Sequence, residues 1–216
     1  MIVLGLTGSM AMGKSTTTKL FACFGVPAFD ADATVHRLYG PGGAAVAPIE
    51  AAFPGTIDAA GAVDRKALSA HVVGHPHALA RLESIVHGLV RLEEKAFLGR
   101  CAAAGVPLVL LDVPLLFETG GNRRCDAVAV VSAPRQIQEM RIMARPGMTR
   151  EKMRAMLARQ MPDAEKRKRA DFVIPSGAGL APATAAIRQI INTLGRRRAG
   201  IWPYGWHRHS HSKKAA

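Results

Sequence analysis

The sequence predicts an α/β fold in which helices cover a mostly parallel sheet. Continuous apolar runs at residues 2–7, 106–114 and 126–134 have the length and bounding turns of buried strands. Stretches with helical periodicity alternate with these runs, and a glycine-rich segment joins the first run to the first helical stretch. Such alternation is typical of parallel sheets with right-handed crossover connections.

Glycine and proline mark the elements of the N-terminal part. A buried strand is expected at residues 2–7, and the stretch KSTTTKLFACF, residues 14–24, follows as a helix that ends at Gly25 and Pro27. VPAFD, residues 26–30, is the next expected strand. From there to about Phe97 the pattern becomes helical and rich in loops, and includes the helix-like LARLESIVHGLVRLEEKAFL.

The C-terminal half repeats the alternation. After the strands at 106–114 and 126–134 we expect a helix at PRQIQEMRIMAR, which ends at Pro146, and a second helix over residues 149–161 with Thr149 as its N-cap. On that second helix Met153, Met156, Leu157, Gln160 and Met161 would share one face. A last strand at ADFVIP and a closing helix at TAAIRQIINTL complete the expected elements. The segment from Arg196 onward has no periodicity and is expected to be disordered.

Composition excludes several classes of protein. The 216 residues allow one main domain with an appended lobe, and 49% hydrophobic with 21% charged residues is a globular composition. The longest apolar run, VPLVLL, is far shorter than the roughly 18 residues of a membrane span. The three cysteines are odd in number and form no CxxC pair, which argues against a disulfide framework and a zinc site. A protein of the cytoplasm is therefore expected, with no membrane partner.

The net charge of +13 is confined to two segments. Residues 141–169 hold ten Lys or Arg against three acids, and residues 196–216 hold six against none. The remaining chain is balanced, so no continuous basic groove is predicted and no nucleic-acid partner is expected. Each basic segment needs its own explanation.

The segment GSMAMGKST carries the strongest functional pattern. The spacing of Gly8, Gly13, Lys14 and Ser15 matches the phosphate-binding loop, and the segment lies between a strand and a helix as that motif requires. In such a loop, backbone N–H groups surround the phosphates, the lysine reaches the β- and γ-phosphates and the hydroxyl residue binds Mg²⁺. The expected nucleotide contacts are Gly8, Ala11, Met12, Gly13, Lys14, Ser15 and Thr16, with Ser15 as the Mg²⁺ ligand. The chain has no NKxD sequence, which favours ATP over GTP.

Two acids, Asp30 and Asp32, follow the second expected strand at its carboxyl end, where open α/β sheets bind their ligands. Side chains two apart in an extended chain face the same way, so both carboxylates could point to one site. There an acid could orient or deprotonate an acceptor hydroxyl. Alternatively, Asp32 could cap the helix ATVHRLY.

Six segments together, in order over residues 1 to about 190, resemble the dephospho-CoA kinase family: LTGSMAMGKST, FDADATVHRLY, GAVDRKAL, LESIVHGLV, LLDVPLLFE and ARQMPDAEKRKRADFVI. The resemblance implies a three-layer α/β/α fold of the P-loop nucleoside-kinase kind with a helical acceptor-binding insertion and a lid. It implies a core at 1–32 and 98–195, a CoA-binding region at 33–97 and a lid at about 146–168 within the core; the basic tail at 196–216 follows these regions. The implied reaction transfers the ATP γ-phosphate to the ribose 3′-hydroxyl of dephospho-CoA, the last step of coenzyme A synthesis.

The resemblance also implies roles for individual residues. Asp32 would be the catalytic carboxylate and Asp30 the other acid of the pair, with His36 and Arg37 near the acceptor. The VPLLFE segment would lie along the acceptor pocket, which makes Leu115, Leu116 and Glu118 candidate contacts, although the leucines could equally be core residues. The chain departs from the family at Gly88, after His87, and at Pro175; the first departure puts in doubt the rigidity of a turn there.

Phosphoryl transfer would explain part of the positive charge of the segment 141–169. Phosphoryl transfer depends on positioned cations, and Arg141 and Arg145, four apart on a predicted helix, would share a face and resemble the family's lid arginines. Arg141 is the candidate catalytic arginine and Arg145 a nucleotide contact. The basic residues after them could equally form a solvated face. Asp112 could contact bound Mg²⁺ or cap a helix.

Two alternatives remain at this stage. The protein could phosphorylate another small alcohol, or it could be a nucleic-acid-binding ATPase that uses the basic tail with Trp202, Tyr204 and Trp206 as stacking residues. A monomer is expected.

Overall fold

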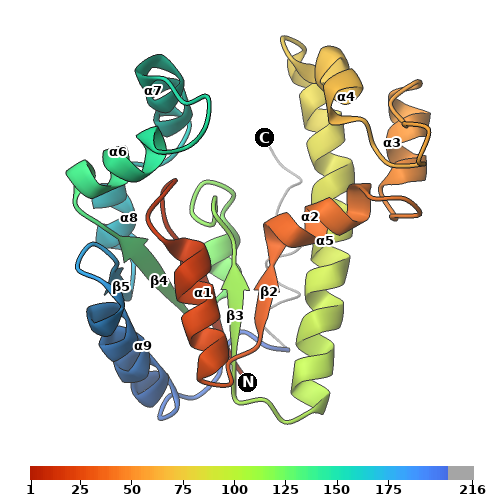
Figure 1. Cartoon of the computed structure of the whole chain (residues 1–216). Helices are drawn as coiled ribbons and strands as arrows, with labels where there is room; N and C mark the ends of the chain where they lie inside the picture. The colour runs from red at the N-terminus through yellow and green to blue at the C-terminus, as the bar shows by residue number, and fades with distance from the viewer. Residues whose placement is uncertain (204–216) are drawn as a thin grey trace. The chain divides into compact units, whose positions relative to one another are not determined.

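The computed structural model describes residues 1–203 (Figure 1). Residues 204–216, which include Tyr204 and Trp206 of the basic tail, lie outside the described part. The chain divides into two compact units. One unit contains Met1–Phe29 and the chain from Cys101 onward, and the other contains Asp30–Arg100.

The first unit is built on a five-stranded sheet with the order β2-β3-β1-β4-β5. Its strands are β1 (Ile2–Thr7), β2 (Ala28–Asp30), β3 (Leu108–Asp112), β4 (Ala127–Ser132) and β5 (Phe172–Pro175). The central strand β1 pairs in parallel with β3 and β4, and β4 pairs in parallel with β5. Every expected strand is present; β1 has the expected bounds, and the others are one or two residues shorter at one or both ends.

Helices and loops cover both faces of this sheet. The helices of the unit are α1 (Lys14–Cys23), η1 (Gly121–Arg124), α6 (Arg135–Met143), α7 (Arg150–Ala158), α8 (Asp163–Arg169) and α9 (Leu180–Leu194). Phe21 of α1 and Ile187 of α9 pack with Leu4 in one buried cluster, and Leu116 packs with Val128 in another. The layered α/β fold predicted from the alternation is therefore confirmed.

The helix at 149–161 differs in part from its prediction. Thr149 is the N-cap and its hydroxyl accepts a hydrogen bond from the Lys152 N–H at 3.2 Å, as expected. The helix ends at Ala158, so Gln160 lies beyond it. The end at Ala158 corrects the prediction that the helix and its shared face extend to residue 161. Met153 is buried, whereas Met156 is 44% exposed.

The second unit is helical, with α2 (Ala31–Tyr39), α3 (Val46–Ala52), α4 (Arg65–Val72) and most of the 28-residue α5 (Pro76–Ala103). Leu38, Ile49 and Leu68 belong to its own buried cluster. Gly88 lies within the continuous helix α5, where an added Cβ would meet nothing within 4 Å. The turn whose rigidity the sequence put in doubt at this position does not exist.

Within residues 1–203, no helix has both the length and the apolar character needed to cross a membrane.

Candidate active site

The phosphate-loop sequence forms the connection between β1 and α1. Helix α1 begins at Lys14, immediately after Gly13, whose φ of 87° lies in the left-handed region that favours glycine. Gly8 permits a close approach to β4, because a Cβ at this position would lie 2.8 Å from the Val131 carbonyl oxygen. The two glycines of the motif are thus required for different reasons, one for its backbone angle and one for space.

A cavity of about 440 Å³ opens on this loop. Lys14, Ser15 and Thr16 line it together with Arg141 in the last turn of α6 and Arg145, which lies two residues beyond the end of that helix. Ala11 and Gly13 of the loop contribute as well, whereas Met12 is buried and does not line the cavity. Leu20, Leu180 and Ala183 provide apolar surface. The cavity therefore combines a polar, basic part suited to phosphates with an apolar part of the kind that accepts a base.

Arg141 is held by partners on two sides of the cavity. Its guanidinium donates to the Ser176 carbonyl oxygen at 2.6 Å and more weakly, at 3.4 Å, to the Ala11 carbonyl oxygen of the loop. The Ser176 hydroxyl in turn donates to the Met12 carbonyl oxygen at 2.5 Å. These contacts orient the Arg141 side chain beside the phosphate loop.

Lys14 forms an ion pair with Asp112, the last residue of β3. The Asp112 side chain is 2% exposed and also accepts a hydrogen bond from the Thr18 hydroxyl at 2.6 Å. No helix of the described chain begins at Asp112, so the helix-cap alternative is wrong. Because positions three apart on a helix are neighbours, the contact of Asp112 with Thr18 places Ser15 on the same side of α1 as this carboxylate.

This arrangement fits Mg²⁺, which takes one or two protein oxygens and completes its shell with phosphate oxygens and water. Ser15 supplies a hydroxyl that lines the cavity, and Asp112 supplies a carboxylate on the same side of α1. Among residues 1–203, no group of three or more His, Cys, Asp or Glu side chains forms a ready metal site. A cation here would therefore depend on the nucleotide for most of its ligands.

The VPLLFE segment has a mixed environment. Leu116 is fully buried in the core of the first unit, whereas Leu115 is 39% exposed. Glu118 pairs with Lys166 at 2.9 Å and accepts a hydrogen bond from the Met161 N–H at 2.9 Å. Burial alone would raise the pKa of the Glu118 carboxyl. The hydrogen bonds from Lys166 and Met161, together with the charge of Lys166, lower this pKa by more than burial raises it, so it lies below its ordinary value.

Four residues predicted to contact the phosphate acceptor lie at the start of the second unit, namely Asp30, Asp32, His36 and Arg37. The Asp30 side chain is the N-cap of α2 and accepts a hydrogen bond from the Ala33 N–H at 2.9 Å. Asp32 is exposed in the first turn of α2, so the helix cap proposed for Asp32 belongs to Asp30. His36 and Arg37 are exposed in the last turn of α2, and His36 Nδ1 lies 3.3 Å from the guanidinium of Arg65.

The sequence model of dephospho-CoA kinases matches residues 2–181 of this chain. The chain belongs to the dephospho-CoA kinase family. It is 55% identical to the dephospho-CoA kinase of Mesorhizobium japonicum over 92% of this chain and 99% of the relative. It is 56% identical to that of Rhodopseudomonas palustris strain CGA009 over 91% of this chain and 97% of the relative.

Solved structures share the fold of this chain. A crystal structure of the protein TT1252 from Thermus thermophilus is 35% identical, with a TM-score of 0.78 over 89% of this chain and 96% of that one. A dephospho-CoA kinase from Campylobacter jejuni covers 89% of this chain and 96% of its own with a TM-score of 0.60. At 23% identity, the second likeness supports the fold alone.

Several residues of this dephospho-CoA kinase family member escaped the sequence-based prediction. Ser176 lines the cavity and holds both Arg141 and the loop, and Lys166 is the fully buried partner of Glu118. Ser176 follows a strand that the sequence does predict, and carboxyl ends of strands are where ligands bind, so its position carried a usable indication. Lys166 stands within a run of charged residues and nothing in that run distinguishes it.

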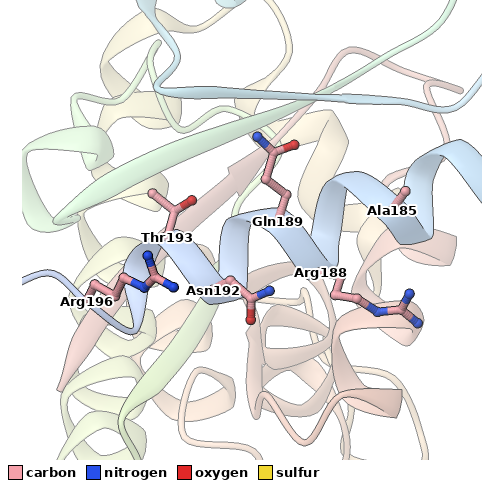
Figure 2. Close-up of a pocket in the computed structure, with 6 residues that line it drawn as sticks. All are labelled: Ala185, Arg188, Gln189, Asn192, Thr193 and Arg196. Atoms are coloured by element: carbon pink, nitrogen blue, oxygen red, sulfur yellow. The ribbon is translucent and has the colours of Figure 1, made fainter.

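A second hollow, of about 390 Å³, lies along α9 (Figure 2) and shares no lining residue with the cavity at the phosphate loop. Arg188, Gln189 and Asn192 are among its lining residues, and all six come from α9 and the residues just after it (Figure 2). Every one of these side chains is exposed. This hollow is therefore a surface of one helix, without groups converging from other elements.

Proposed function

We propose that this protein transfers the γ-phosphate of ATP to the ribose 3′-hydroxyl of dephospho-CoA, giving coenzyme A and ADP. Family membership at more than half identity over nine tenths of the chain supports the substrate pair. The single structural observation that carries the proposal is the cavity in which Lys14, Arg141 and Arg145 converge on the phosphate loop. The reaction completes coenzyme A synthesis. We place the protein in the cytoplasm and expect it to act as a monomer.

On the nucleotide side, the residues act by position and charge. The backbone N–H groups of the loop and the first turn of α1 receive the phosphates, and Lys14 provides a mobile charge near the β- and γ-phosphates. Arg141 is anchored beside the loop and stabilises the charge that spreads over the transferred phosphoryl group. Arg145 lines the same cavity and adds positive charge from the chain just after α6.

Mg²⁺ is part of this proposal. Ser15 would hold the ion, with Asp112 beside it on the same side of α1. When bound, it would neutralise charge on the phosphate oxygens that leave with ADP.

On the acceptor side, Asp32 would accept the proton of the 3′-hydroxyl or orient that hydroxyl toward the γ-phosphate. Asp30 holds the start of α2 through its cap and thereby supports the position of Asp32. His36 and Arg37 would contact the anionic acceptor from the same helix. Leu115 and Glu118 remain predicted contacts, whereas full burial of Leu116 leaves it no surface for a ligand.

The test is conversion of dephospho-CoA to coenzyme A by the purified protein with ATP and Mg²⁺, followed by chromatography of both thiols. Nucleosides and shikimate-like alcohols serve as competing acceptors, and ATP hydrolysis with and without RNA tests the nucleic-acid alternative. The proposal expects phosphorylation of dephospho-CoA alone and no stimulation by RNA. Faster phosphorylation of another alcohol, or RNA-dependent ATP hydrolysis without coenzyme A formation, would overturn it.

A further inference from the structure

Two glutamine side chains hydrogen-bond to the backbone of Met10 in the phosphate loop, one as a donor and the other as an acceptor. Gln138 Nε2 donates to the Met10 carbonyl oxygen at 2.8 Å, and Gln160 Oε1 accepts a hydrogen bond from the Met10 N–H at 2.9 Å. Gln138 is only 6% exposed. Since one amide must present its nitrogen and the other its oxygen, the backbone of Met10 dictates the orientation of both side chains.

One glutamine, Gln138, precedes the predicted lid of residues 146–168, and the other, Gln160, lies within it. Gln138 lies in the middle of α6, and Gln160 lies two residues beyond the end of α7. The segment between them, residues 139–159, contains Arg141, Arg145 and the whole of α7. Both ends of this segment are therefore tied to one residue of the loop, so that the lid arginines and the loop share a common anchor.

The contact at the Met10 carbonyl also has a consequence within the loop. In a planar trans peptide, the carbonyl oxygen and the following N–H point in opposite directions. Binding of the Met10 oxygen by Gln138 therefore turns the Ala11 N–H to the opposite side of that peptide. Ala11 has a φ of 62°, which side chains with a Cβ rarely adopt, so its conformation depends on such external contacts.

We propose that Gln138 and Gln160 are positioning residues that hold the Met10 peptide groups, orient the Ala11 N–H for a nucleotide phosphate and fix both ends of the segment 139–159 to the loop. This inference rests on the proposed nucleotide binding but not on the identity of the acceptor. Neither side chain lines the cavity, so both act through the loop.

Opposite requirements for donor and acceptor allow a reciprocal test. Gln138→Glu replaces the donor with a carboxylate that would face the Met10 carbonyl oxygen, whereas Gln160→Glu keeps an acceptor oxygen for the Met10 N–H. Both substitutions have the same shape and the same change of charge. Because Gln138 is buried and Gln160 is only half-buried, the uncharged variants Gln138→Leu and Gln160→Leu are measured as well, which separates loss of the hydrogen bond from burial of a new charge.

The measurement is the Kd for ATP by titration calorimetry, with kcat and KM for dephospho-CoA measured in parallel. Gln138→Glu and Gln160→Leu are expected to weaken ATP binding about tenfold or more, the range for a buried peptide group deprived of its partner. Gln160→Glu is expected to stay within about threefold of the parent, since the acceptor survives. Gln136→Glu, an exposed glutamine on the same helix, controls for charge and is expected to have no effect.

Equal effects of Gln138→Glu and Gln160→Glu on ATP affinity, or a Gln138→Glu variant within about threefold of the parent, would overturn the inference. Melting curves verify folding; if Gln138→Glu unfolds, Gln138→Leu replaces it with the same expected loss. Parent protein that binds ATP but does not phosphorylate dephospho-CoA would refute the proposed function, while the ATP affinities of the variants would still decide the role of the glutamines.

Discussion

The buried ion pair between Lys166 and Glu118 predicts a large, pH-dependent loss of stability on Glu118→Gln. Lys166 is fully buried, and its Nζ lies 2.9 Å from Glu118 Oε1 and 3.1 Å from the Pro114 carbonyl oxygen. The glutamine side chain keeps an acceptor for the Met161 N–H. It removes the negative charge that balances the buried ammonium, so the variant isolates the electrostatic contribution.

The magnitude follows from the burial of the pair. Removing one partner of a buried pair costs about 3–5 kcal/mol, and because the Glu118 side chain is 19% exposed we expect the lower end. At about 3 kcal/mol and about 2–4 °C per kcal/mol for a domain of this size, the melting temperature falls by about 6–12 °C. The double variant Glu118→Gln with Lys166→Met is expected to recover most of this loss, because an apolar pair replaces the isolated charge. Pro114 retains the hydrogen bond from Thr7 at 2.8 Å in that variant.

Helix α8 offers a matched control. Glu165 and Lys168 are also 2.9 Å apart, but their side chains are 45% and 73% exposed. Glu165→Gln removes the same charge at the same distance in water, where exposed pairs contribute little. Its melting temperature is therefore expected to match that of the parent.

The pH dependence has a definite sign. Because the pKa of folded Glu118 is lowered, the unfolded chain binds its proton first as the pH falls. The contribution of Glu118 is complete above the ordinary carboxyl pKa of about 4.3 and is lost as the pH falls through the lower pKa of the folded state. Melting curves from pH 7 downward should thus show the difference between parent and Glu118→Gln shrinking. A difference that grows on acidification, or a variant as stable as Glu165→Gln at pH 7, would refute the reasoning.

Three further predictions concern catalysis. Lys14→Met is expected to lower kcat by about 10²-fold or more, the scale for one lost stabilising donor, while Lys19→Met on the exposed side of the same helix leaves kcat unchanged. Arg141→Ala is expected to lower turnover by about 10³-fold, on the scale of an arginine finger, and a loss under about tenfold would contradict that role. Asp32→Asn is expected to lower kcat by about 10²-fold or more with KM for ATP unchanged; a rise in KM for ATP at constant kcat would assign Asp32 to nucleotide binding instead.

The local parts of the fold could be predicted from the sequence because their determinants lie within one segment. The run from Ile2 to Lys14 contains the strand, the glycines and the helix start, so spacing alone indicated the phosphate loop. The cap at Thr149 followed in the same way from one hydroxyl before a helical pattern. In each case the determinants lie within one short segment, residues 2–14 for the loop and 149–152 for the cap.

The sequence could not predict the partners that come from distant elements. Gln160 reaches Met10 across 150 positions, and Asp112 reaches Lys14 across 98, because the sheet order brings β3 and β4 to either side of β1. The sequence also could not predict which of two neighbouring apolar residues is buried. Leu115 and Leu116 have the same side chain, and only the backbone path after β3 decides that the second enters the core.

The pairing of Lys14 with Asp112 connects the geometry of the site to the proposed reaction. In this structure the Lys14 side chain is 16% exposed and its charge is balanced by a carboxylate that also binds Thr18. Lysine has a flexible stem of four carbons, so its ammonium can turn from that carboxylate to a phosphate without movement of the helix. A triphosphate that takes over Lys14 leaves Asp112 next to Thr18 and on the Ser15 side of α1, where a carboxylate favours a divalent cation. Nucleotide and Mg²⁺ should therefore each favour binding of the other. The nucleotide draws Lys14 away from Asp112, and Mg²⁺ then balances the Asp112 charge; Mg²⁺ beside Asp112 in turn frees Lys14 for the phosphates.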